Sequence, residues 1–321
     1  MKFNSILNRF HSFGGMRLVR EYIRIGLFPS ILSQFMRTLL GMQSLETSVD
    51  LVFLKVDKFL RNKYRTFMFQ LIEKYKDEAL GNSAPKVWSC WFQGFDSAPE
   101  LVRICIASRK YFISDKEHVF ITLENYSEYI SLPQYIEEKF HKGIIPMALF
   151  SDLIRLELLI RYGGTWMDST VLCTGNTYPK SFFDCDLFMF QYLRPKTNAF
   201  AGISNWFISA RSNHRLLLVL RDMLYQYWKD YDCVLQYFIF HRFFYMIIHE
   251  FPETITNMPK GIHPAPALLA KHLTDEYDEK WMSELLAKTC FHKLTYRLSK
   301  QAVNNEHTYY AEIVRRFSRM L

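Results

Sequence analysis

The segment that most constrains this chain runs from Ala148 to Thr174 and reads ALFSDLIRLELLIRYGGTWMDSTVLCT. In its first half, apolar residues recur every three or four positions, which predicts a helix with one buried face. The pair Gly163–Gly164 then lets the backbone end the helix and turn sharply. A short strand follows, and it carries a single acidic residue, Asp168, among neighbours that favour burial. The segment therefore predicts a helix that leads directly into a strand of a sheet.

Asp168 is the unexpected residue of this strand. Aspartate is depleted in strands and is almost never fully buried without a partner. A divalent metal ion with a phosphate behind it is the simplest partner for such a carboxylate. Alternation over 165–172 places Asp168 and Thr170 on one face of the sheet. Asp152 and Arg155 lie three positions apart on the helix and face the same region, although alone they would make an ordinary surface ion pair.

The cluster GNSAP at 81–85 breaks regular structure and divides the chain into two parts. The first part, 1–84, contains two or three predicted helices, one of them over 51–80. The second part, 85–321, is long enough to bury a sizeable core as one catalytic domain. We therefore predict a helical N-terminal extension followed by an α/β domain.

The start of the second part predicts the order strand, helix, strand over 86–92, 100–111 and 118–123. This order implies a mostly parallel sheet flanked by helices, with a right-handed crossover. Ligands of such sheets bind beyond the carboxyl ends of the strands. The loop 93–99 and Asp168 would both lie at that edge, which predicts a ligand site there.

Four residues near the first strand are candidates for contacts with a nucleotide. Gln93 and Gly94 open the loop and could approach the ligand through amide and backbone groups. Trp88 and Trp91 fall on opposite faces of the strand, so at most one of them meets a base. The alternative for either tryptophan is a large core residue.

The central segment resembles the signature of a known family. SDLIRLELLIRYGGTWMDSTV is similar to that of the capsular polysaccharide synthesis proteins, relatives of glycosyltransferase family 32. The segments PKVWSCWFQGFDSAPELVRICIASRKYF, HVFITLENYSEYISLP, NWFISARSNH and CFHKLTYRLSK resemble other parts of that family. The resemblance spans about 85–300. It implies a GT-A-like, Rossmann-type glycosyltransferase that uses a nucleotide-sugar donor, is usually metal-dependent and usually retains configuration.

The resemblance also assigns roles to single residues. It implies that Asp152 and Arg155 contact the ribose and the sugar of the donor, and Arg155 would also steady the departing diphosphate. Asn205 corresponds to an asparagine near the donor sugar and the acceptor, or else serves turn chemistry alone. His292 and Lys293 correspond to a C-terminal metal-binding histidine and a phosphate-binding lysine. Their alternative is a solvated basic turn.

The implied metal site has few protein ligands. The wider family carries Asp-x-Asp where this chain has Asp168, Ser169 and Thr170. The expected ligands of Mn²⁺ or Mg²⁺ are Asp168, Thr170 and His292, with the diphosphate and waters completing the shell. The acceptor hydroxyl would attack the anomeric carbon while the metal and Arg155 neutralise the leaving group. A UDP-sugar is the expected donor, and an oligosaccharide or a lipid-linked glycan is the expected acceptor.

Charge and cysteine content limit the partners and the cellular location that we expect for this protein. The formal net charge is +8 at pH 7, yet no recognisable nucleic-acid motif is present, so we expect no nucleic-acid partner. The cysteines are scattered without metal-binding spacing, which predicts reduced thiols in a cytoplasmic protein. We identify no convincing secretory signal and no apolar run long enough to span a bilayer. The segment 234–251 is the nearest to one, and its central His241-Arg242 indicates a buried or interfacial helix instead.

Residues 1–42 are basic and amphipathic, with six basic side chains against one acid, Glu21. One interpretation is peripheral attachment to the inner face of the cell membrane. The other is a basic helical extension packed on the catalytic domain. Two alternatives to an enzyme also stay open: an inactive GT-A-like scaffold of a polysaccharide assembly complex, and a peripheral membrane protein that acts through this segment.

Overall fold

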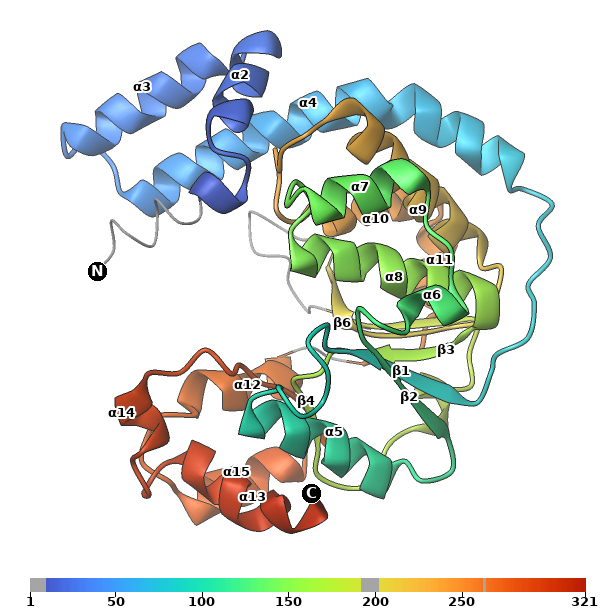
Figure 1. Ribbon diagram of the computed structural model, residues 1–321, viewed down its shortest axis with the longest axis vertical. Helices are drawn as coiled ribbons and strands as arrows, with labels where there is room; N and C mark the ends of the chain where they lie inside the picture. Colours follow the sequence, from blue (N-terminus) through green and yellow to red (C-terminus); the bar gives the residue numbers. More distant parts are fainter. Residues whose placement is uncertain (1–9, 192–201, 262–263) are drawn as a thin grey trace.

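The structure is a computed structural model that describes residues 10–191, 202–261 and 264–321 (Figure 1). In the described part of the chain, the helices α2 (Met16–Arg24), α3 (Phe28–Leu39) and α4 (Leu45–Lys74) precede the sheet. Ser44 caps α4, because its side chain accepts a hydrogen bond from the Thr47 amide at 3.1 Å. The helix that was predicted over 51–80 thus begins and ends earlier. Beyond it the chain runs extended, and Gly81 and Ala84 donate to the backbone oxygens of Ser212 and Tyr162.

Within the described residues, the central sheet has five strands, in the order β2-β1-β3-β6-β5. Its members are β1 (Lys86–Cys90), β2 (Glu117–Ile121), β3 (Gly164–Met167), β5 (Leu187–Gln191) and β6 (Ile203–Ala210). β1 pairs in parallel with β2 and β3, whereas β6 is antiparallel to both of its neighbours. The predicted α/β class with a mostly parallel sheet flanked by helices is therefore confirmed.

Helices cover both faces of the sheet (Figure 1). On one side lie α6 (Tyr126–Tyr129), α7 (Gln134–His141), α8 (Met147–Tyr162), α9 (Arg215–Asp230), α10 (Ile239–Glu250) and α11 (Pro252–Asn257). On the other lie α5 (Glu100–Phe112), α12 (Pro264–His272), α13 (Glu279–Leu286), α14 (Lys300–Val303) and α15 (Tyr309–Phe317). Short 3₁₀ turns cover Lys180–Phe182 and Ser318–Met320, and β4 (Val171–Cys173) pairs with β7 (Phe291–Lys293) in a small antiparallel sheet.

The junction between α8 and β3 depends on glycine. Gly163 and Gly164 have φ angles of 68° and 92°, a region that side chains with a Cβ rarely adopt. A Cβ on Gly163 would also lie 2.9 Å from the carbonyl oxygen of Ala210 on the neighbouring strand. The sharp turn and the close approach of β6 therefore both require a residue without a side chain.

The predicted strand over 165–172 is divided in the structure. β3 ends at Met167, and β4 starts at Val171. Asp168 lies directly after β3, where its amide still donates to the carbonyl oxygen of Trp206 at 2.8 Å. The amide of Val171 then donates back to the Asp168 carbonyl at 3.0 Å. The prediction of one continuous strand was wrong, because this turn redirects the chain at the carboxylate.

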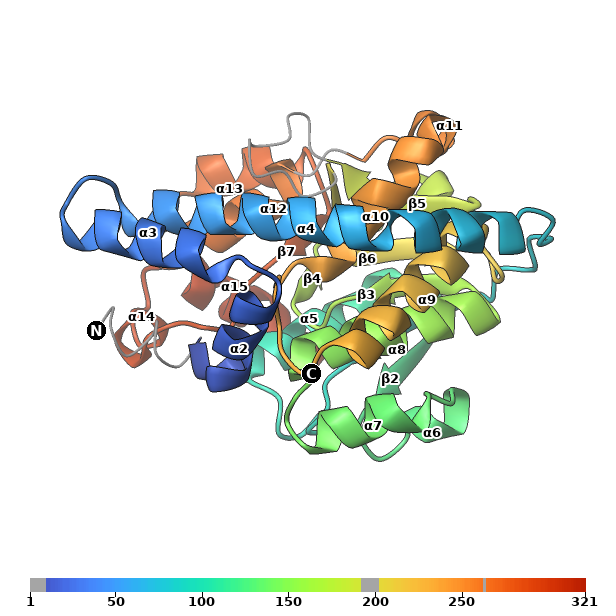
Figure 2. The ribbon, with the colours of Figure 1, turned by 90° about the horizontal axis from the view of Figure 1, so that it is seen from above.

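The helix α4 is joined to the rest of the molecule by its apolar face. Val56, Leu60, Tyr64 and Met68 are buried along it, in the same hydrophobic core as the helices α8, α9 and α10. Figure 2 shows α4 crossing the length of the molecule, with α3 beside its first half. Within the described residues, none of the helices combines the length and apolar character that a membrane span requires.

Candidate active site

A cavity of about 350 Å³ lies where β3 ends. Residues from four different elements converge on it: Asp152 and Arg155 from α8, Asp168 from the turn after β3, Asn205 from β6, and Lys293 from β7. Its volume falls in the range of small-molecule sites. The structure thus brings together five polar residues that the sequence had singled out, together with Thr170.

Two cations hold the Asp168 carboxylate. Its Oδ1 accepts hydrogen bonds from the Arg155 guanidinium at 3.1 Å and from the Trp166 indole at 3.0 Å. Its Oδ2 lies 2.9 Å from the Lys293 ammonium. Burial alone would raise the pKa of Asp168, but Lys293 and Arg155 outweigh it and leave that pKa below its usual value. Asp168 is therefore a carboxylate at neutral pH.

Arg155 connects the acidic residues of the cavity. Its side chain is 5% exposed and reaches the Asp152 carboxylate at 3.1 Å and the Asn205 carbonyl at 2.8 Å. The guanidinium also lies over the Trp166 ring, 4.8 Å from its centre. A planar group with several donors is needed to serve these partners at once. The lysine ammonium has no such planar arrangement of donors.

Asp152 differs from Asp168 in its protonation. It is buried, and its Oδ1 also accepts a hydrogen bond from the Asn205 side-chain amide at 3.1 Å. Burial raises the pKa of Asp152 to about 7, although Arg155 opposes this rise. The charge on Asp168 adds to the increase. Near neutral pH Asp152 is therefore only partly ionised, whereas Asp168 is a carboxylate.

A further arginine fixes Asp168 from behind. Arg109, on α5, is 1% exposed and donates to the backbone oxygens of Met167 and Asp168, both at 3.0 Å. These bonds hold the turn at which β3 ends. No motif in the sequence singles out Arg109. Its position within the buried face of a predicted helix was the available signal, since a fully buried arginine needs partners.

Trp88 and His292 are not among the described residues that line the cavity. The Trp88 ring is fully buried and its indole donates to the Gly163 carbonyl at 2.9 Å, so it serves the core. Trp91 lines the cavity instead. His292 precedes Lys293 on β7, and successive strand residues face opposite sides. Its ring is fully buried beside Thr174, at 3.2 Å from the hydroxyl, and burial lowers its pKa to about 4.

Gln93 and Gly94 lie in the loop that follows β1, outside the described lining of the cavity. The Gln93 side-chain amide contacts the sulfur of Met147 at 3.3 Å, at the first turn of α8. Gly94 has a φ angle of 86°, and a Cβ there would meet open space. Both residues thus lie in the loop beside the cavity but are not among its described lining residues.

The structure adds aromatic residues and a histidine to the cavity. Tyr237, Phe238, His241 and Tyr296 line it beside Trp91. Burial and the neighbouring Arg155 lower the pKa of His241 to about 3, so this ring is neutral at physiological pH. The signal in the sequence was the polar His-Arg pair at the centre of an otherwise apolar helix. That pair was interpreted only as an argument against a membrane span.

The expected metal ligands are present in part. Asp168 Oδ2 and Thr170 Oγ1 converge on the Lys293 ammonium, at 2.9 and 2.5 Å. A carboxylate and a hydroxyl are the hard oxygen ligands that suit Mg²⁺ or Mn²⁺, which can keep several waters. Among the described residues, no group of three or more His, Cys, Asp and Glu side chains gathers around a common point. The available oxygens therefore fit an ion that would draw most of its ligands from water and substrate.

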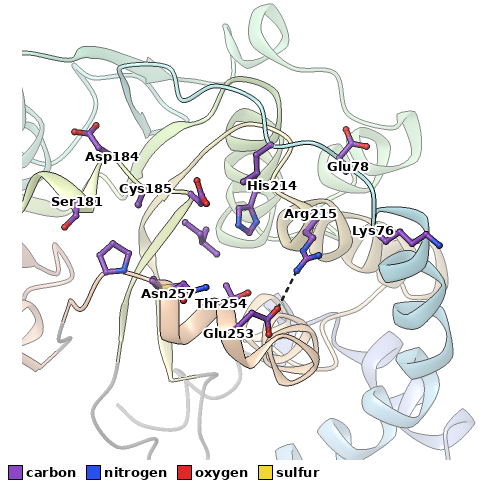
Figure 3. A pocket seen from close by; sticks show the side chains of 15 residues that line it. Lys76, Glu78, Ser181, Asp184, Cys185, His214, Arg215, Glu253, Thr254 and Asn257 are labelled. Atoms are coloured by element: carbon purple, nitrogen blue, oxygen red, sulfur yellow. Dashed lines mark ion pairs between the residues drawn. The ribbon is translucent and has the colours of Figure 1, made fainter.

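A larger cavity, of about 700 Å³, lies near the opposite end of the sheet (Figure 3). It borders Leu187 of β5. Leu187 pairs with Ala210 of β6 and therefore lies away from the end of β3. The carboxylates that line it are Glu78, Asp184, Asp186 and Glu253, and one of its two cations, Arg215, pairs with Glu253 at 3.5 Å. This excess of acid disfavours an anionic nucleotide. The smaller cavity is therefore the better candidate for the active site.

Comparison with known proteins identifies the family. A family model described as "Capsular polysaccharide synthesis protein" matches residues 38–313. The chain belongs to this family. A search of the curated proteins finds no match. Among solved structures, the chain is similar to "PaToxG Glycosyltransferase", with 12% sequence identity, a TM-score of 0.37, and coverage of 80% of this chain and 95% of that one. The relationship to glycosyltransferase family 32 stays a prediction.

Proposed function

We propose that this capsular polysaccharide synthesis protein is a glycosyltransferase. It would move a sugar from a nucleotide-diphosphate-sugar donor, in the first place a UDP-sugar, to a hydroxyl of a growing cell-surface glycan. The observation that carries the proposal is the Asp168 carboxylate, held between Lys293 and Arg155 at the carboxyl end of β3. Ligands of α/β sheets bind at this edge, and the family itself is one of polysaccharide synthesis.

The two cations supply what a diphosphate leaving group requires. Negative charge develops on the diphosphate as the bond to the anomeric carbon breaks, and positioned donors that face this charge stabilise the transition state. Lys293 is 29% exposed and is the more accessible of the two. We infer that it contacts the diphosphate directly. Arg155 is almost fully buried. It therefore holds Asp168 and adds positive charge to the site from the protein interior.

Asp152 and Asn205 are suited to the hydroxyls of the donor. They share a hydrogen bond at 3.1 Å across the cavity, from β6 to α8. Carboxyl and amide groups that already have fixed partners bind hydroxyls in defined orientations. Among the aromatic residues, Trp91 is the candidate for stacking on a base. We propose that configuration is retained: the acceptor oxygen would form its bond to the anomeric carbon on the same face from which the diphosphate oxygen leaves, and the hydroxyl proton would pass to that leaving oxygen.

A divalent ion, Mn²⁺ or Mg²⁺, belongs to the proposal as well. Asp168 and Thr170 would hold it, and His292 would not, because its ring faces away from the cavity. When bound, the ion would neutralise the diphosphate. Lys293 would then turn from Asp168 to the phosphate oxygens. We further propose that the reaction takes place on the cytoplasmic side, where nucleotide-sugars are available.

A donor screen tests the proposal. Purified protein is incubated with UDP-, GDP- and CMP-sugars, with and without Mn²⁺ or Mg²⁺, while nucleotide release and thermal stability are followed. We expect one donor class to raise the melting temperature and to be hydrolysed slowly. Asp168→Asn should weaken the stabilisation and greatly slow the hydrolysis, whereas Asp186→Asn, at an exposed ion pair with Arg211, should leave both unchanged. If folded protein responds to no donor, the inactive-scaffold interpretation gains support.

A further inference from the structure

Helix α3 carries an apolar face that the described residues leave uncovered. Leu32, Phe35, Met36, Leu39 and Leu40 are between 46% and 68% exposed. Their spacing of three, one, three and one residues places them on a single side of a helix. Eleven of the twenty large apolar side chains that the described residues leave exposed lie between 16 and 54. The exposure is thus concentrated in one region.

The opposite side of α3 is fixed to α4 by polar contacts. The Thr38 hydroxyl lies 2.5 Å from the Ser48 hydroxyl, and the Gln43 side chain donates to the Gln34 side chain at 2.7 Å. The Ser48 hydroxyl also donates to the Gln34 carbonyl at 3.2 Å. A helix in water usually points its apolar side inward. Here much of the apolar surface points outward from a defined helical pair, which indicates a partner for it.

The charge carried by α2 and α3 is positive. Arg17, Arg20 and Arg24 on α2 and Arg37 on α3 are all exposed. The one acid between 16 and 42, Glu21, pairs with Arg24 at 2.6 Å. Exposed apolar side chains interspersed with arginine are suited to a bilayer that contains anionic lipids. A second protein chain would need complementary acids, whereas a bilayer supplies both phosphate and acyl chains.

The same region is attached to a wall of the candidate active site. The Val234 amide donates to the Phe13 carbonyl at 2.8 Å, and the Phe13 ring stacks on Tyr237 with 5.8 Å between ring centres. Tyr237 and the following Phe238 line the cavity. The Tyr22 hydroxyl, on α2, lies 3.4 Å from the Leu235 carbonyl. A surface that holds α2 and α3 would therefore hold this side of the cavity as well.

We propose that α2 and α3 bind an anionic bilayer surface, with the apolar face of α3 inserted among the lipids. Attachment by this face needs no membrane span. It places the wall formed by Tyr237 and Phe238 near the lipid surface. The consequence for the acceptor, a glycan carried by the membrane, rests on the proposed transferase function. Binding to the bilayer itself does not.

Vesicle sedimentation tests the proposal on the full chain without any donor. Vesicles contain phosphatidylcholine alone or mixed with phosphatidylserine. We expect binding to the mixed vesicles, and weaker binding as salt increases. The triple variant Phe35→Ser, Leu39→Ser and Leu40→Ser should lower the partition coefficient ~tenfold or more. Arg37→Glu should weaken binding to the mixed vesicles more than binding to neutral ones.

A matched control carries serine at three exposed apolar positions elsewhere, Tyr111, Leu123 and Val303, and should bind as the parent does. Circular dichroism checks that all variants fold. Absence of binding by the parent protein would overturn the proposal, and so would full binding by the folded triple variant. A dimer that the triple variant dissociates, in a protein that ignores vesicles, would assign the face to a second copy instead. Because no donor is present, none of these outcomes depends on catalysis.

Discussion

The Lys293 ammonium lies 2.9 Å from Oδ2 of Asp168 and 2.5 Å from the Thr170 hydroxyl. The lysine ends β7, and the two oxygen ligands belong to the turn between β3 and β4. A side chain from the C-terminal part of the chain thus places its positive charge between the oxygens that would hold a divalent ion. Under the proposed function, Lys293 and a divalent ion would compete for the same carboxylate, and this competition can be measured.

Replacing Lys293 by methionine should tighten Mn²⁺ binding and weaken binding of a nucleoside diphosphate. The first effect follows because the ammonium no longer occupies Oδ2 of Asp168. The second follows because a charge-assisted contact with the phosphate is lost, which corresponds to ~tenfold or more in affinity. Calorimetric titrations with Mn²⁺ and with UDP measure both, and Lys288→Met, at an exposed position, is the control. Unchanged Mn²⁺ affinity would argue against a metal at Asp168.

Asp168→Asn should lower transfer or donor hydrolysis by about 10²–10³-fold, the usual cost of removing one positioned electrostatic contact. The amide is nearly the same size, and its oxygen can still accept from Trp166 and Arg155. Its charge, however, no longer balances Lys293 and Arg155. Initial rates at saturating donor, compared between parent and variant, give the effect. A variant with parental rates would remove Asp168 from the mechanism.

Arg155→Met should reduce the free energy of unfolding by about 3–5 kcal/mol, the range found when one partner of a buried ion pair is removed. The reason is that Asp152 loses the cation that faces it, while Asp168 loses one of its two and keeps only Lys293. Urea denaturation measures the change. Arg215→Met provides a contrast, because its pair with Glu253 is 3.5 Å long and largely exposed. That variant should lose less than about 1 kcal/mol.

Much of the fold and of the site followed from local patterns in the sequence. The Gly163–Gly164 break, the apolar periodicity of α8 and the strand-helix-strand order over 86–123 each depend on neighbouring residues alone. They predicted the parallel core of the sheet and brought Asp152, Arg155 and Asp168 to one edge. The position of a lone carboxylate in an apolar context identified the same edge, since burial without a partner is costly.

The parts that sequence reasoning missed depend on long-range contacts. Which face of β7 meets the cavity is decided by its pairing with β4, and this pairing turns Lys293 inward and His292 away. The choice between Trp88 and Trp91 likewise depends on which side of β1 is covered by α8. His241 enters the site only because α10 packs beside β6. No local pattern contains these facts.

Asp152→Asn should change how stability depends on pH. The pKa of Asp152 is raised from 3.8 to about 7 by burial, with Arg155 opposing and Asp168 adding to the rise. Between about pH 4 and pH 7 the unfolded chain therefore releases a proton that the folded protein keeps, and the free energy of unfolding falls by up to about 1.4 kcal/mol per pH unit. Above the pKa that Asp152 has in the folded protein, the loss in free energy of unfolding is complete and stays constant. Asparagine removes this loss and can accept the same hydrogen bonds.

The free energy of unfolding of the variant minus that of the parent should thus grow as the pH rises from about 4 to about 7, and then level off. Asp168 acts in the opposite sense, because its pKa is lowered: its stabilisation is present above the unfolded pKa and is lost as the pH falls through the folded one. Both chains share that contribution, so it cancels in the difference. Urea denaturation of both proteins across this range measures the curve. A flat difference would mean that Asp152 is charged throughout, and that Arg155 balances both carboxylates at once.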